Sequence, residues 1–400
     1  MRQGKLRQKV EPRMDTRYLQ SLNIQAAGEG NTYYQDVHDI IQASSSGGEC
    51  VERFAEFIEG AGFADASLYG LTLNHRRDTA DEVHRLVCND LAEYGGFALH
   101  LNYNLAGEVT EITHVPFEIC RLEEPDSNGY VAHICTHPDW TQKKTFAGKK
   151  KDINMKTVKR FHKYNPNIDV LHAQIAQVGG IENYQGQIFY FSSAGRDRYP
   201  IPRADRVLTE MSTDEGLANV KWRNVRNNFL PSAMILTRKG QASPMGRYAP
   251  AGEEPYQYER GERYANDGFS DTLLKFQGDT EACKLLEVIL ENDEQAPEVV
   301  SLPTSNYDKD FQVTDQSVTE RIYAAFGQEP WYCIRSGKIG FSGTLLVDAF
   351  AYYNSIVYKY QRMIERAFTD ILSHWHGGAV TNCSVLPLEY KQAETTTPTA

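Results

Sequence analysis

Three side chains that can bind a metal ion occupy alternate positions of one short stretch: His133, Cys135 and His137, with Asp139 following. Alternate residues of a β-strand share one face, so this spacing could hold zinc. The sequence offers no fourth ligand at a recognised spacing, and the polar edge of a strand explains the same pattern. We therefore expect no metal here. A metal-dependent nucleic-acid-processing enzyme that uses residues 133–139 is the alternative function.

Other catalytic signatures are missing from the sequence. It contains no G-x-x-x-x-G-K-[ST] phosphate loop and no G-x-S-x-G nucleophile turn. Adjacent acids such as Glu123 and Glu124 point apart in a helix or a strand, away from a shared reaction centre. His374 and His376 lie near a predicted helix end, where cations favour the helix dipole. From the sequence we expect no catalytic residue and no bound cofactor, and we expect that the protein is not an enzyme.

Three cations, Lys221, Arg223 and Arg226, lie within six residues of one predicted helix. The helix spans 203–228 and ends before Pro231, which cannot continue it. Its apolar stripe is too thin for a helix buried all round, so one face is solvated. These three residues are the candidates for contact with DNA in a channel.

Ion pairing is the alternative role for these cations. Asp214, Glu215 or a neighbouring subunit could supply the carboxylates. Exposed pairs on a helix contribute only about 0.3–0.5 kcal/mol. Both roles remain open at this point.

Composition limits the class of protein. A chain of 400 residues exceeds one ordinary core, which predicts two or more packed units. A net charge of -11 argues against a protein that coats nucleic acid, although DNA could slide past an acidic wall. The seven cysteines form no C-x-x-C pair and are expected to be reduced, as in the cytosol. No apolar run is long enough to span a membrane, and no secretory signal is recognised.

The predicted elements describe an α+β fold. Helical spacing predicts helices at about 33–44, 48–60, 79–94, 203–228, 283–290, 314–326 (with Thr314 as N-cap) and 345–375. Alternation predicts strands at 97–103, 108–115, 117–122, 129–136, 168–178, 184–193, 233–237, 299–302 and 383–388. The lysine-rich stretch 142–163 is a solvated face or a contact with DNA phosphate or an acidic partner. Residues 239–267 are expected to form a long loop or insertion.

Several short patterns, taken in order, resemble the portal proteins of tailed phages. These are a Y-P-x-P entry at Tyr199, then N-x-x-x-N-F-x-P-S over 224–232, A-F-G-Q-E-P over 325–330 and V-L-P-L over 385–388. The resemblance covers most of residues 31–390. It is one of order and pattern.

The resemblance implies a division of the chain. It reads 1–30 mobile basic arm; 31–150 wing, first half; 151–200 small β clip; 201–230 stem helix; 231–342 wing, second half; 343–390 long C-terminal helix and closing strand; 391–400 polar tail. The loop at 302–314 is the first candidate for the channel constriction, with 239–267 the second. Little of the chain is left for a crown.

The same resemblance implies a function. Portal proteins form a ring, expected here to hold 12 subunits, at one capsid vertex, through which double-stranded DNA is packaged and ejected. The implied partners are the large terminase subunit, a head-completion or adaptor protein and the major capsid protein, with no membrane. The implied location is the virion, and the host cytoplasm during assembly.

Overall fold

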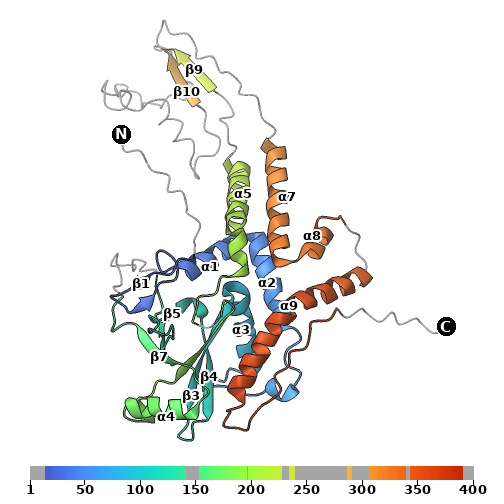
Figure 1. The fold of residues 1–400 in the computed structure, drawn as a ribbon. Helices are drawn as coiled ribbons and strands as arrows, with labels where there is room; N and C mark the ends of the chain where they lie inside the picture. The colour runs from blue at the N-terminus through green and yellow to red at the C-terminus, as the bar shows by residue number, and fades with distance from the viewer. Residues whose placement is uncertain are drawn as a thin grey trace, which may run out of the picture. The chain divides into compact units, whose positions relative to one another are not determined.

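The structure is a computed structural model that describes residues 14–140, 153–195, 197–227, 234–238, 286–290, 307–338 and 343–390. The chain divides into two compact units, Met1–Asp214 with Gln316–Ala400, and Glu215–Asp315. The first unit contains a group of helices and a mostly antiparallel sheet, and the helix labelled α4 lies beside that sheet (Figure 1). The fold is therefore α+β, as predicted.

Three helices begin the first unit: α1 (Tyr33–Ala43), α2 (Ser45–Glu59) and α3 (Ala80–Tyr94). They confirm the three helices predicted for this part of the chain. A capping box starts α3, because the Thr79 side chain accepts from the Glu82 amide while the Glu82 carboxylate accepts from the Thr79 amide. Three short 3-10 helices, η1 (Ala66–Leu68), η2 (Phe117–Ile119) and η3 (Ile181–Asn183), lie in the connections.

A six-stranded sheet with the order β4-β3-β8-β7-β6-β5 forms the other half of this unit. Its strands are β3 (Gly96–Tyr103), β4 (Val109–Val115), β5 (Cys120–Leu122), β6 (His133–Thr136), β7 (Lys159–Lys163) and β8 (Gln187–Ser192). Neighbouring strands are antiparallel except β7 and β8, which are parallel. The strands predicted near β3, β4, β5, β6 and β8 are confirmed.

The region predicted as a separate clip, 151–200, needs two corrections. Its strands β7 and β8 belong to the same sheet as β3 to β6, so the described part of this region is continuous with the supposed wing. The strand predicted at 168–178 is a helix, α4 (Ile168–Gln177). Asn167 caps that helix, since its side chain accepts from the Asp169 amide at 2.9 Å.

Residues 14–30 were predicted to be part of a mobile arm, and this is also corrected. β1 (Tyr18–Leu19) pairs with β2 (Ile24–Gln25), and Ile24 and Ala27 are fully buried. The physical reason is a small apolar cluster that includes Cys135 of β6. It consists of Leu22, Ile24, Cys135, Trp140 and Val158.

The later helices follow the predictions more closely. η4 (Arg203–Val207) and α5 (Leu208–Asn227) occupy the predicted helix 203–228. α7 (Tyr307–Phe326), α8 (Glu329–Arg335) and α9 (Gly343–Leu372) follow. α7 begins before the predicted N-cap Thr314, so residues 307–314 of the candidate constriction loop are helical. α9 confirms the long helix predicted at 345–375.

The described strands of the second unit are β9 (Met234–Arg238) and β10 (Leu286–Leu290), which pair in parallel. β9 confirms the predicted strand. β10 replaces the short helix predicted at 283–290, and its β-branched Val288 and Ile289 favour an extended backbone. The predictions for 1–13, 141–152, 239–267, 299–302 and 391–400 lie outside the described residues.

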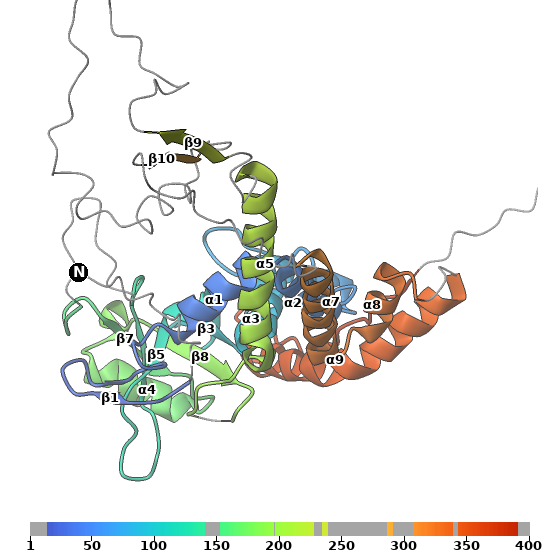
Figure 2. The ribbon, with the colours of Figure 1, turned by 90° about the horizontal axis from the view of Figure 1, so that it is seen from above.

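The main core of the first unit forms where α9 packs against α2 and α3 (Figure 2). Phe57 of α2 lies 4.8 Å from Tyr353 and 5.6 Å from Trp331 between ring centroids.

The strand predicted at 383–388 is not formed. Val385 makes a single β-bridge to Phe63 in its place. Among the described residues, the helices lack a segment long and apolar enough to cross a membrane.

Candidate functional site

The first turns of α5 are fixed to the start of α2. The buried Asp214 carboxylate accepts from Ser44 Oγ at 2.7 Å and from the Ser46 amide at 3.1 Å. A carboxylate at a helix N-terminus satisfies free amides and favours the positive end of the dipole. Asp214 is thus committed to α2, and the described cation Lys221 does not make the predicted pair with it.

Lys221, one of the three candidate channel cations, pairs with a different carboxylate. Its Nζ donates to Asp315 Oδ2 at 2.6 Å within the second unit, and the two side chains are 50% and 39% exposed. Exposed pairs of this kind contribute about 0–1 kcal/mol, so solvent and other anions compete readily. For Arg223 and Arg226 the structure describes the backbone of α5, and their proposed contact with DNA stays a prediction.

The His133, Cys135 and His137 side chains are each occupied by other contacts. His133 Nδ1 lies 2.6 Å from Glu123 Oε2. Cys135 is fully buried in the small apolar cluster, and burial raises the pKa of its thiol to about 12. His137 Nδ1 accepts from the Asp139 amide at 3.1 Å. Within the described ranges, no group of three or more His, Cys, Asp or Glu side chains could hold a metal ion.

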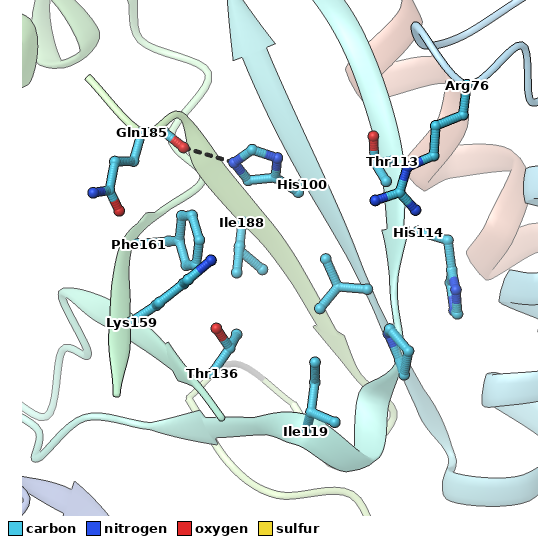
Figure 3. A pocket seen from close by; sticks show the side chains of 12 residues that line it. Arg76, His100, Thr113, His114, Ile119, Thr136, Lys159, Phe161, Gln185 and Ile188 are labelled. Atoms are coloured by element: carbon cyan, nitrogen blue, oxygen red, sulfur yellow. Dashed lines mark hydrogen bonds between the residues drawn. The ribbon is translucent and has the colours of Figure 1, made fainter. Parts of the chain in front are cut away.

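The sheet carries a hollow of about 610 Å³, called the concave face below. Side chains from β3, β4, β6, β7 and β8 line it, with Lys159 and Phe161 on one side and Arg76 and His114 on the other (Figure 3). The lining consists of Arg76, His100, Thr113, His114, Val115, Pro116, Ile119, Thr136, Lys159, Phe161, Gln185 and Ile188.

The concave face contains positive and polar groups over an apolar floor, and no carboxylate lines it. None of the ion pairs found among the described residues involves Arg76 or Lys159. His100 Nε2 donates to the Gln185 carbonyl at 2.6 Å, and burial lowers the pKa of this imidazole. His114 Nε2 lies 2.8 Å from Asp90 Oδ2, behind the lining. The face is suited to an anionic ligand and carries no nucleophile–base pair.

A second hollow of about 420 Å³ adjoins the first. The two share Lys159, Phe161 and Gln185, and the second adds the cations Lys156 and Arg160. Its lining also contains no carboxylate. Sequence reasoning did not find the concave face, because its residues are spread from 76 to 188. Only the lysine-rich stretch, with an acidic partner as one of its predicted roles, pointed toward it.

Comparisons with known proteins give structural neighbours alone. No protein-family model matches the chain, and no curated protein matches it. Among solved structures, one chain in the neck of an empty gene transfer agent particle, computed with C6 symmetry, has 13% identity and a TM-score of 0.47, covering 88% of this chain and 84% of that one. A chain from the native neck with C12 symmetry has 11% identity and a TM-score of 0.46, with the same coverage. A chain from the native virion has 12% identity and a TM-score of 0.44, covering 88% and 83%.

Proposed function

We propose that the chain is a portal subunit of a tailed phage or a phage-like particle. It assembles into a ring-shaped channel at one capsid vertex, through which double-stranded DNA enters and leaves. The observation that carries the proposal is a pair of long helices, α5 and α7, each of which crosses a boundary between the two units in the sequence. The order of patterns that resembles portal proteins supports it independently.

The pairing of α5 with α7 rests on two ion pairs. Arg321 lies 3.5 Å from Glu210 in the first unit, and Lys221 lies 2.6 Å from Asp315 in the second. From the first pair to the second, the residue number rises along α5, from 210 to 221, and falls along α7, from 321 to 315. The two helices therefore run antiparallel. We assign the stem role to this helix pair and the clip role to the part of the second unit that lies between the two helices in the sequence. This assignment replaces the one in which residues 151–200 form the clip.

Charge fits a passive channel. A duplex that must move cannot be held by many cations, because each retained Lys–phosphate contact strengthens binding and its salt dependence. A subunit with a net charge of -11 repels the duplex, while a few cations such as Lys221 steady it. We propose that the chain supplies geometry, that a separate motor supplies the work, and that the protein is not an enzyme.

The proposed partners are other copies of the chain in a ring of 12, the large terminase subunit, a head-completion or adaptor protein, and the major capsid protein. The proposed location is the capsid vertex of the virion. The metal-dependent nuclease alternative needed His133, Cys135 and His137 as common ligands. No observation favours it, since these side chains have separate partners.

Mass and shape measurements test the proposal. Twelve copies of 45.3 kDa have a mass of about 540 kDa, which light scattering after size exclusion distinguishes from a monomer. We expect that mass, together with annular particles in negative-stain micrographs. A purified chain that stays monomeric at all salt and protein concentrations tested contradicts the proposal.

A further inference from the structure

We infer that the concave face is the socket for a neighbouring copy, whose β5–β6 loop inserts into it. The inference rests on the proposed ring, and it names the surfaces by which one copy holds the next. A ring with rotational symmetry of this kind uses heterologous contacts, in which two different patches on each copy meet. Among the described residues, the concave face carries cations and the β5–β6 loop carries carboxylates.

The socket, together with the second hollow that adjoins it, has no carboxylate in its lining. The two adjoining hollows are lined by 20 different residues without one Asp or Glu, although 53 of the 400 residues of the chain are acidic. Arg76 and Lys159 stand at opposite sides of the larger hollow (Figure 3). Because neither belongs to an ion pair within the described residues, a bound carboxylate would gain two cations without displacing an internal partner.

The β5–β6 loop has the complementary properties. Residues 124–130 are seven consecutive exposed residues that include Glu124 and Asp126 and no cation. Asp126 Oδ1 accepts from the amides of Asn128 and Tyr130, each at 2.8 Å. The backbone amide of Gly129 also donates to the Asp126 carbonyl at 2.9 Å. These bonds hold the loop in one conformation before it binds, which lowers the entropic cost of association.

The loop does not fill the socket of its own chain. It joins β5 to β6 at one end of these strands, whereas the socket residues Ile119 and Thr136 lie at the other end, where Cys120 pairs with Thr136. The occupant must therefore come from elsewhere. DNA is a poorer candidate, because phosphate contacts are polar and the floor of the socket is formed by Ile119, Phe161 and Ile188.

Charge reversal at the socket tests the inference. Arg76→Glu with Lys159→Glu should raise the protein concentration needed for half-assembly at least about tenfold in sedimentation velocity, because two attractive pairs become repulsive. The control variant Lys359→Glu with Arg362→Glu makes the same change of net charge at exposed positions of α9. It should assemble as the wild type does. Circular dichroism and melting of each variant verify the fold.

Reversal at the loop provides the rescue. Glu124→Lys with Ser127→Lys leaves Asp126 and its turn in place and should weaken assembly by a similar factor. Combining the socket and loop variants in one chain should restore assembly, because every socket then meets an oppositely charged loop.

Four results overturn the inference. Wild-type rings with unimpaired socket variants refute the socket but leave the portal function standing. Equal loss in the socket and control variants shows an effect of net charge, and a combined variant that stays dissociated shows that the two patches do not meet. A wild-type chain that never associates overturns both the inference and the proposed function.

Discussion

Acid should destabilise this protein in part through one buried imidazole, that of His84. The residue has no exposed surface, and its ring centroid lies 4.5 Å from that of Phe63 and 5.9 Å from that of Phe368. Its Nε2 is 3.4 Å from Cys88 Sγ, and its Nδ1 has no hydrogen-bond partner. Burial lowers the pKa of His84 from 6.5 to about 4. The native state therefore holds the ring neutral.

The sign of the pH dependence follows from this lowered pKa. Between pH 6.5 and about 4, His84 is protonated in the unfolded chain and neutral in the folded one. The unfolded state then binds more protons, so the free energy of unfolding falls as the pH falls. Each pKa unit corresponds to about 1.4 kcal/mol, so the full effect is about 3 kcal/mol, reached near pH 4.

The variant His84→Leu isolates the contribution. It replaces the titrating imidazole by an apolar side chain of similar size. All other acid-sensitive groups are the same in the wild type and the variant, so they affect the stability of both proteins equally. Urea unfolding followed by tryptophan fluorescence should show the wild type losing about 3 kcal/mol more than the variant between neutral pH and about pH 4. An equal loss in both proteins, or an NMR titration that gives His84 an ordinary pKa, would refute the reasoning.

Three further predictions concern the proposed channel and the packing of the first unit. Lys221→Glu with Arg223→Glu should leave rings intact and reduce DNA packaging or retention in a packaging assay; failed assembly would instead place both residues at a subunit interface, and normal packaging would exclude either role. Asp214→Ala should cost about 1–2 kcal/mol in urea unfolding, because the Ser44 hydroxyl and the Ser46 amide lose their acceptor, with Asp214→Asn costing less. Gly186→Ala should cost more than about 2 kcal/mol, since its φ is 80° and a Cβ would lie 2.2 Å from a backbone carbonyl. Its control, Gly129→Ala, has a φ of 79° and open space, and a similar loss in both would refute the steric argument.

Much of the secondary structure was accessible from the sequence because its signals are local. Thr79 and Glu82, which form the capping box of α3, are three residues apart. The apolar residues of α9 recur every three or four residues along one helix. Such patterns predict an element without information about its neighbours. The prediction failed where a short apolar segment fits both the helical period and the strand period, as in α4 and β10.

Burial of charge is decided by partners that are distant in sequence. Arg121 follows β5's first residue and looks like an ordinary exposed cation, yet it has no exposed surface. Its guanidinium donates to Asn31 Oδ1 at 2.6 Å and to the Glu118 carbonyl at 2.7 Å, and lies 5.1 Å from the Trp140 ring centroid. Oxygen acceptors and an aromatic face replace water around the cation. No local sequence pattern predicts these partners.

The sequence by itself determined the α+β class, the main helices and the hairpin of β3 and β4, because caps, turns and hydrophobic periods act over a few residues. Only the tertiary structure decided that residues 14–30 pack on the sheet, that β7 and β8 belong to it, and that Lys159 faces Arg76 across a hollow. Strand order and long-range pairing depend on the burial of whole faces, which no single segment encodes. A surface without carboxylates in an acidic chain could therefore be recognised only once the sheet had brought its strands together.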